Sequence, residues 1–105
     1  MAQFDVYDNP SVTSRRYYPY VVDIQSRYLE ALATRIVIPL GRRSLFKNVA
    51  MKGLTPEVTF AGEELLVLTP QLSSVPKKQL KKAVGSLAHQ REEIVNAVDF
   101  AIFGV

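Results

Sequence analysis

Apolar and polar residues alternate in short runs along the first part of the chain. Residues 3–8 and 20–26 each show the period-two pattern of a half-buried strand. In the second run, one face carries Tyr20, Val22 and Ile24, and the opposite face carries Asp23 and Gln25. Residues 35–40 form a β-branched run that we expect to end at Pro39, because proline cannot donate a hydrogen bond to a strand ladder.

Glycine and proline residues mark turns and loops between the strands predicted up to about residue 80. Residues 57–69 predict a hairpin with Gly62 near its turn. Residues 73–78 predict a loop, because Pro76 holds the residue before it out of the helical region. Several short strands without repeats or linkers indicate a small antiparallel sheet or barrel.

The last segment changes to a helical period. Its apolar residues recur at spacings of three, four and seven, which is typical of an amphipathic helix: Leu87, Ile94, Val98, Ala101, Ile102 and Val105. We expect Ser86 to cap the start of this helix and Gly104 to end it. Glu92 and Glu93 lie in the early turns, where the helix dipole favours acidic side chains.

Composition fits one domain over residues 1–105, since 48% of the residues are hydrophobic and 22% are charged. The absence of cysteine excludes disulfides and thiolate chemistry. The start of the chain lacks the pattern of a secretory signal, and no stretch approaches the roughly 20 apolar residues of a membrane span. We therefore expect a cytoplasmic protein that does not bind membranes.

The residues give no sign of a catalytic centre. His89 is the single histidine, and beside Gln90 and Arg91 it is more typical of a surface than of a general base. The Glu63–Glu64 and Glu92–Glu93 pairs are adjacent, so their carboxylates point in different directions. Neither a metal-ligand spacing nor a phosphate-binding glycine motif occurs. We expect a binding protein without cofactor or metal, not an enzyme.

The end of the chain is unusually apolar for a terminus. Phe103, Gly104 and Val105 close the sequence with no polar tail after them. Asp99 lies near the helix end, where the dipole disfavours a carboxylate by roughly 0.3–1 kcal/mol. Such an end is either buried in the protein's own core or dimer, or enters a partner that offers a basic group.

Basic residues gather at three places, Arg15–Arg16, Arg42–Arg43 and residues 77–82. The net charge of +3 permits an acidic or nucleic-acid partner. No aromatic residue interrupts the lysine run, so it lacks the stacking surface of a single-strand binder.

Five segments together resemble the CcdB family of plasmid-addiction toxins: QFDVY at the start, VVDIQS at 21–26, RIVIPL at 35–40, SVP at 74–76 and NAVDFAIFGV at the end. The resemblance implies a mainly β fold, a small SH3-like antiparallel barrel of the CcdB, Kid and MazF kind, with an extra small sheet and a C-terminal helix. It also implies a homodimer that binds the A subunit of DNA gyrase and traps the complex with cleaved DNA.

The resemblance further implies a CcdA-like antitoxin. Such an antitoxin wraps the toxin, removes it from gyrase and joins it in repressing their operon, so operator DNA is reached only through the antitoxin complex. Antitoxin tails of this type are acidic and disordered, and the candidate residues for binding one are Arg15, Arg16, Lys77 and Lys78.

The gyrase-binding residues of the family carry over onto positions at the end of the helix and in the segment after VVDIQS: Tyr28, Leu29, Asp99, Ile102, Phe103, Gly104 and Val105. The chain departs from the family's best-known member at two of them. Phe103 replaces a tryptophan, and Asp99 replaces an amide. Ala88 also stands where that member has a capping serine.

Two other functions stay open. A MazF- or Kid-like endoribonuclease would share the barrel, with His89 and scattered arginines as its available side chains. A homologue that keeps antitoxin binding but does not poison gyrase would fit the replacement of tryptophan by Phe103.

Overall fold

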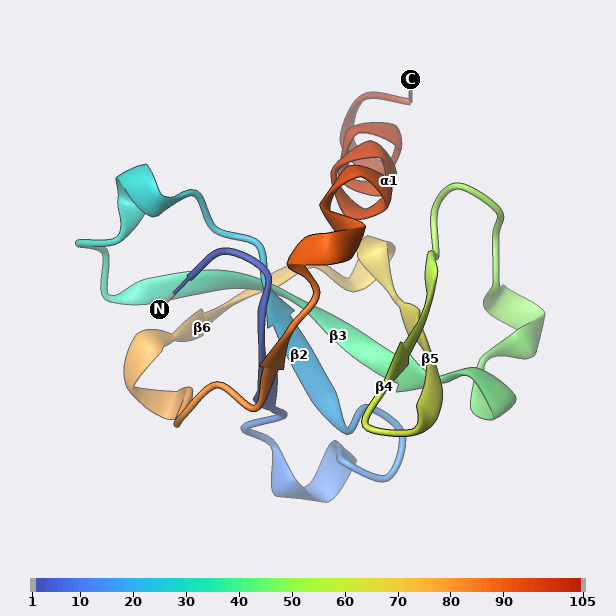
Figure 1. Cartoon of the computed structure of the whole chain (residues 1–105), viewed down its shortest axis with the longest axis horizontal. Helices are drawn as coiled ribbons and strands as arrows, with labels where there is room; N and C mark the ends of the chain where they lie inside the picture. The colour runs from blue at the N-terminus through green and yellow to red at the C-terminus, as the bar shows by residue number, and fades with distance from the viewer. Residues whose placement is uncertain (1, 105) are drawn as a thin grey trace.

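The computed structural model describes residues 2–104. Over this range it holds a seven-stranded sheet and one α-helix (Figure 1). The strands are β1 (Asp5–Asp8), β2 (Tyr20–Asp23), β3 (Thr34–Arg42), β4 (Glu57–Phe60), β5 (Glu63–Val67), β6 (Ser73–Pro76) and β7 (Gly85–Ser86), and the helix is α1 (Arg91–Phe103). Short 3-10 turns join them: η1 (Val12–Ser14), η2 (Arg27–Leu29), η3 (Arg43–Leu45), η4 (Lys47–Val49), η5 (Thr69–Gln71), η6 (Lys77–Gln79) and η7 (Ala88–Gln90).

The long strand β3 organises the sheet. All strand pairs are antiparallel, and the order along the sheet is β4-β5-β3-β2-β1-β7. One edge of β3 has two partners, since its first half pairs with β6 and its last three residues pair with β5. This change of partner lets the sheet curl into a half-barrel (Figure 1).

The two ends of the sheet meet at Gly85. A Cβ atom placed on Gly85 of β7 would lie 2.5 Å from the ring of Phe60 on β4. The Phe60 ring also packs edge-on against Tyr20, with ring centroids 5.0 Å apart. The missing side chain at Gly85 therefore makes room for the aromatic contact that draws β4 toward β7.

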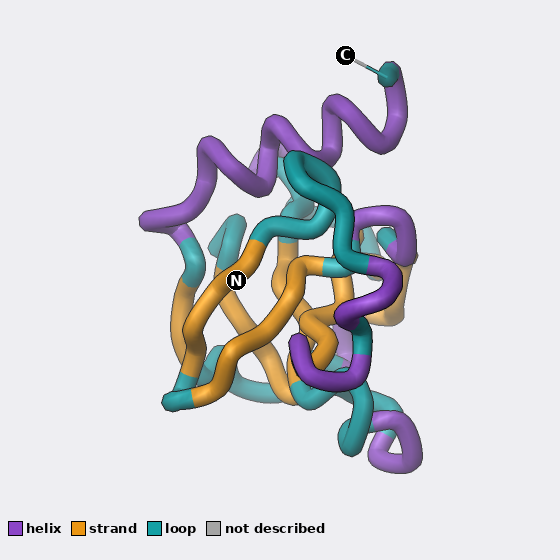
Figure 2. Tube along the Cα trace, turned by 90° about the vertical axis from the view of Figure 1, so that its right-hand side faces the viewer, coloured by secondary structure: helices purple, strands orange, loops and turns teal. Residues whose placement is uncertain are grey.

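The main core lies between the concave face of the sheet and α1. The helix lies across one end of the strands, and its C-terminal end extends past them (Figure 2). Helix α1 contributes Ile94 and Ala97 to this core, and both are fully buried. The sheet contributes side chains from its inner face. A smaller cluster on the other face holds Tyr7, Val21, Val37 and Leu80. The mainly β fold with a C-terminal helix is therefore confirmed.

Two strand predictions were wrong. Residues 73–76 belong to β6 and not to a loop, because their extended backbone pairs with β3 from Thr34 to Val37. Strand β3 also continues past Pro39 to Arg42. The proline is tolerated because it lies where β3 changes partner, and its carbonyl accepts a hydrogen bond from the Leu68 N–H at 3.1 Å.

The helix begins later than predicted. The Ser86 hydroxyl accepts a hydrogen bond from the Ala88 N–H at 3.1 Å, but Leu87 is the N-cap of η7 and α1 begins at Arg91 without a side-chain cap. Leu87 is buried but precedes both helical segments. Gly104 ends α1 as predicted, in the left-handed conformation at φ +73°. No helix over residues 2–104 is long and apolar enough to cross a membrane.

Candidate functional site

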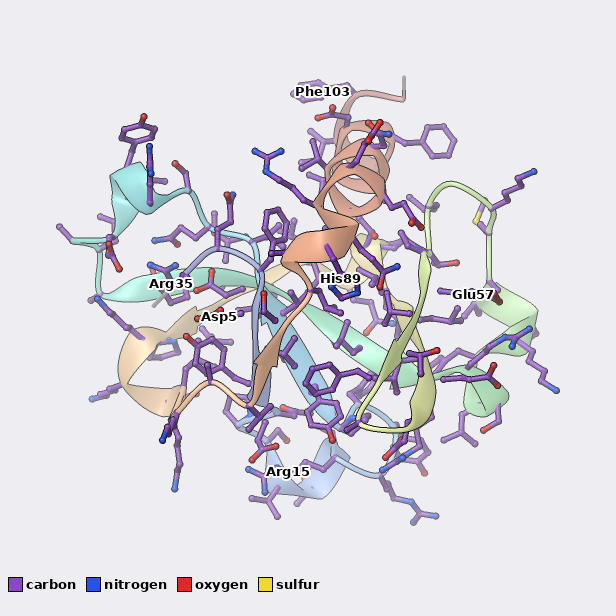
Figure 3. All side chains as sticks on the ribbon, viewed as in Figure 1. Asp5, Arg15, Arg35, Glu57, His89 and Phe103 are labelled. Carbon is purple, nitrogen blue, oxygen red and sulfur yellow. The ribbon has the colours of Figure 1, made fainter. Side chains whose placement is uncertain are left out.

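Helix α1 passes from the core into solvent along its length. Ile94 is fully buried, but Phe100, Ile102 and Phe103 are 42%, 59% and 72% exposed. Figure 3 shows Phe103 at the extreme end of the molecule. Each such side chain forgoes part of the roughly 1.5–3 kcal/mol that full burial would supply, so this end is an apolar surface without a partner inside the described chain.

The helix terminus keeps this surface in a defined conformation. The Gly104 N–H donates to the Phe100 carbonyl at 3.0 Å, which closes the last turn. Asp99 is exposed in this region, and no basic residue lies in the last turn to offset its charge. The predicted contact residues Asp99, Ile102, Phe103 and Gly104 are thus brought together at one end, while Val105 lies outside the described residues.

A groove of about 380 Å³ runs beside this end of α1. Most of its lining is apolar, and its residues come from three segments: Leu54, Thr69, Pro70, Leu72, Val98, Ala101 and Ile102. The groove is continuous with the exposed tip through Ile102. Together they form an apolar strip that could receive another protein surface.

The predicted pair Tyr28 and Leu29 lies on a separate projection. Both residues belong to η2, where the Ser26 hydroxyl accepts a hydrogen bond from the Tyr28 N–H at 3.2 Å. Tyr28 is 83% exposed and Leu29 44% exposed. Turn η2 stands at the left of Figure 1 and the end of α1 at the top. Within one chain the structure does not bring this pair against Phe103.

A buried glutamine holds the η2 segment in place. Gln25 is 1% exposed. Its side-chain amide donates to the Leu29 carbonyl at 2.8 Å, and its carbonyl oxygen accepts from the Ile36 N–H at 3.0 Å. The side chain therefore ties the exposed segment to β3. The alternation pattern correctly predicted that Gln25 and Val22 point to opposite faces of the strand. It did not indicate that the face with Gln25 is also buried.

A buried ion pair lies beside this glutamine. Asp23 and Arg35 are 0% and 1% exposed. The Arg35 Nε and Nη2 atoms both contact Asp23 Oδ2, at 2.9 and 2.6 Å. The neighbouring Tyr7 has a pKa raised above its usual value, chiefly by burial and then by repulsion from Asp5 and Asp23, against the opposing effect of Arg35. These groups form a polar layer beneath the outer face of the sheet.

The predicted antitoxin-binding residues lie on different elements. Arg15 follows η1, and its Nε donates to the Asn9 carbonyl at 2.7 Å. The guanidinium of Arg16 lies 5.2 Å from the centre of the Tyr17 ring. Lys77 begins η6, and its ammonium donates to the Glu30 carbonyl at 3.2 Å. Lys78 is exposed.

A groove of about 280 Å³ separates the η1 region from β6 and η6. Its floor is apolar, with Val21, Val37, Pro39 and Val75, and its walls carry polar side chains. Arg15 and Lys77 adjoin groove-lining residues on its two sides, Ser14 and Gln79. Neither Arg15 nor Lys77 lines the groove itself, so the antitoxin-binding residues stay a prediction.

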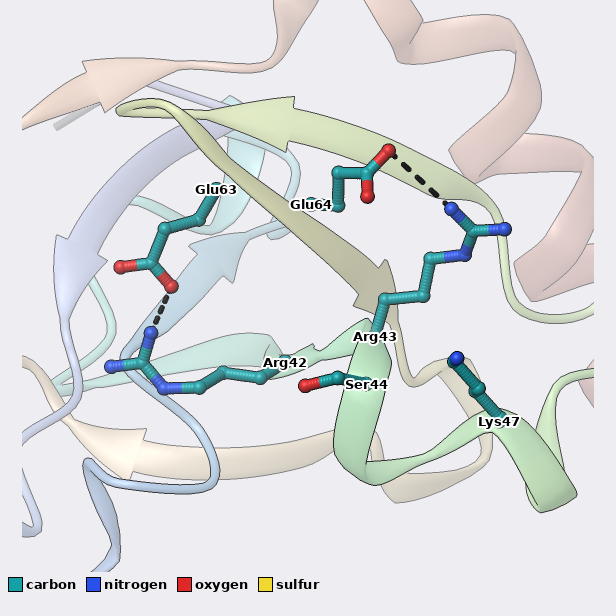
Figure 4. Close-up of a pocket in the computed structure, with 6 residues that line it drawn as sticks. All are labelled: Arg42, Arg43, Ser44, Lys47, Glu63 and Glu64. Carbon is teal, nitrogen blue, oxygen red and sulfur yellow. Dashed lines mark hydrogen bonds and ion pairs between the residues drawn. The ribbon is translucent and has the colours of Figure 1, made fainter.

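A second polar groove, of about 400 Å³, was not predicted (Figure 4). It is lined by Arg42, Arg43, Ser44, Lys47, Glu63 and Glu64. Arg42 pairs with Glu63, and Arg43 Nη1 lies 3.4 Å from Glu64. Because each arginine faces a carboxylate, the charges largely cancel, and these contacts fasten the end of β3 to the β4–β5 hairpin. Side chains distant in sequence meet here, so no local motif could have indicated the groove.

The fold is that of a small β-barrel protein. Its surface presents an apolar helix end and several exposed basic residues, which is the arrangement of a binding protein. The family model described as CcdB protein matches residues 3–104. The chain therefore belongs to the CcdB family and is a toxin of the toxin–antitoxin class. The structure is also similar to the Mycobacterium tuberculosis toxin MazF-mt6, with a TM-score of 0.69, 14% identity and 95% of each chain covered. At this identity the likeness shows the fold alone.

Proposed function

We propose that this protein is a toxin that binds the A subunit of DNA gyrase and traps gyrase on cleaved DNA. The observation that carries the proposal is the exposed apolar end of α1, where Ile102 and Phe103 project into solvent beside Asp99. A rigid aromatic side chain at a helix end is the kind of anchor that dominates protein interfaces. An arginine of the partner could both stack on Phe103 and pair with Asp99.

The proposed active form is a homodimer. The apolar groove beside α1 and the exposed Phe100 ring offer a self-complementary surface that a second copy would bury. A twofold arrangement would set two α1 ends close together and present two η2 projections around them. Tyr28 and Leu29 stay predicted gyrase contacts in this dimer.

An acidic antitoxin tail is proposed to occupy the groove between η1 and β6. The apolar residues Val21 and Val37 in its lining suit the apolar side chains of such a tail, and the basic residues Arg15 and Lys77 on the neighbouring segments would pair with its carboxylates. Because this groove does not include α1, the tail could hold the toxin while another antitoxin segment displaces gyrase. Repression of the operon by the joint complex is part of the same proposal.

The test is a gyrase cleavage assay on supercoiled plasmid with ATP. Full-length protein is compared with a variant lacking residues 103–105, since these residues supply no buried core side chain among those described. We expect linear, protein-linked DNA to accumulate only with the full-length protein. If neither protein traps gyrase while both stay folded, the chain is a non-poisoning homologue that would bind only its antitoxin.

Endoribonuclease activity is a second candidate, which the concave surface around His89 favours. Exposed His89 lines a concave surface with Arg43, Glu57, Glu64 and Gln90. This surface therefore combines an imidazole, carboxylates and a guanidinium, the groups that RNA cleavage would need. Purified protein incubated with a long RNA distinguishes the two functions. Cleavage that is lost in His89→Ala would favour the nuclease, and intact RNA would favour the gyrase poison.

A further inference from the structure

The segment between β6 and β7 carries a strong local charge that the proposed gyrase contact does not use. Residues 77–83 read KKQLKKA, with four lysines and no acidic residue. Lys78, Lys81 and Lys82 are exposed, and none of their ammonium groups has a hydrogen bond or ion pair with another residue between 2 and 104. Lys77 differs from them, because its ammonium is occupied by the Glu30 carbonyl.

The backbone of this basic segment is fixed at both ends. The Lys77 N–H donates to the Ala33 carbonyl at 2.8 Å, and the Val84 N–H donates to the Val6 carbonyl at 2.7 Å. Between them, Leu80 is 6% exposed and belongs to the smaller core cluster, against which Ala83 also packs. With these apolar residues turned inward, the free lysines project from a held backbone, so little backbone entropy is lost when they bind a ligand.

The position of the segment leaves the tip of α1 accessible. In Figure 1 it lies at the lower left, on the side of the sheet away from the tip of α1. Figure 3 likewise places Phe103 at the top and Arg15 at the bottom. A ligand on the lysines would therefore not cover the apolar surface proposed to enter gyrase.

The chemistry of the segment favours a polyanion with a uniform charge. An acidic peptide or a membrane surface normally also needs a group of exposed apolar side chains, but Leu80 is buried and Val84, at the end of the segment, is its one exposed large apolar residue. A single nucleic-acid strand needs aromatic side chains for stacking, and the segment has none. Double-stranded DNA offers a phosphate charge about every 1.7 Å, which lysine binds as a point charge.

We propose that the toxin itself contacts the phosphates of double-stranded DNA through Lys78, Lys81 and Lys82. The family resemblance implies that operator DNA is reached only through the antitoxin complex, so this contact would be an additional one, made by the toxin itself and without sequence information. It would strengthen a repressor complex on DNA and would bring the free toxin to the DNA on which gyrase acts.

The experiment measures fluorescence anisotropy of a short labelled duplex with the purified toxin, across roughly 50 to 200 mM NaCl. The test variant is K81Q/K82Q, and the matched control is K47Q/K52Q, which removes two exposed lysines elsewhere and lowers the net charge equally. Circular dichroism and Tm confirm that both variants fold. Neither gyrase nor antitoxin is present, so the result does not depend on the function proposed above.

We expect K81Q/K82Q to weaken binding by about tenfold for each lysine lost at the lower salt concentration, and to flatten the slope of log affinity against log salt by about two. The control variant should bind almost as the wild type does. The proposal is overturned if the wild type fails to bind the duplex, or if the two variants lose affinity equally, because net charge alone would then account for the effect.

Discussion

At the scale of single residues, the most consequential pair is Asp23 with Arg35. Both side chains are removed from water, so each charge depends on the other for compensation. The pair also orients the turn after β2, because Asp23 Oδ1 accepts the Gln25 N–H at 3.0 Å and Gln25 in turn holds η2. The exposed η2 segment, a proposed contact site, is therefore positioned by charges inside the protein.

Replacing Asp23 by asparagine should strongly destabilise the fold. The change keeps the size of the side chain but leaves the Arg35 guanidinium buried without a counter-charge, which costs about 3–5 kcal/mol. Urea unfolding followed by circular dichroism measures the loss. Glu63→Gln is the control, since it removes the carboxylate charge of the partly exposed Arg42–Glu63 pair and should cost less than about 1 kcal/mol. Equal losses in the two variants would contradict the assigned role of the buried pair.

At the scale of elements, strands with a clear period were predictable from the sequence. The runs at 3–8, 20–26 and 57–69 all contain strands of the structure. Strand β6 was missed because Ser-Ser-Val-Pro has little local strand character, and its conformation depends on pairing with β3 more than thirty residues earlier. The exposed end of α1 could be expected from its composition, whereas Tyr28 and Leu29 were identified only through the family resemblance.

The contact between β4 and β7 can be tested at Gly85. Gly85→Ala should destabilise the protein by about 1–3 kcal/mol, because the new methyl group would overlap the Phe60 ring. In a Phe60→Leu background the same change should become neutral or stabilising by about 0.4–1 kcal/mol, since alanine restricts the unfolded chain more than glycine does. Urea unfolding of the wild type, the two single variants and the double variant gives the free energies of unfolding for this double-mutant cycle. A cost at Gly85 that is unaffected by Phe60 would show that this contact does not close the half-barrel.

At the scale of the whole molecule, the two proposed interaction surfaces lie on different sides. The apolar strip runs along the end of α1, and the basic groups lie around η1 and η6 (Figure 1). This separation allows a toxin to hold an acidic or phosphate-bearing partner while its helix end contacts another protein. In the proposed homodimer we therefore expect the apolar strip, and not the basic side, to supply the interface.

The proposed dimer can be disrupted from within the apolar groove. Ala101 lines this groove and is exposed in the single chain. Ala101→Asp should therefore leave the protomer folded, but it would place two carboxylates in a shared apolar interface and shift the protein toward monomer. Sedimentation velocity measures this shift, and the Tm should fall and lose its dependence on concentration. Thr13→Asp adds the same charge at the exposed η1 turn and should leave the dimer intact. A dimer that survives Ala101→Asp but dissociates with Thr13→Asp would place the interface on the basic side, and the α1 ends would then not lie together.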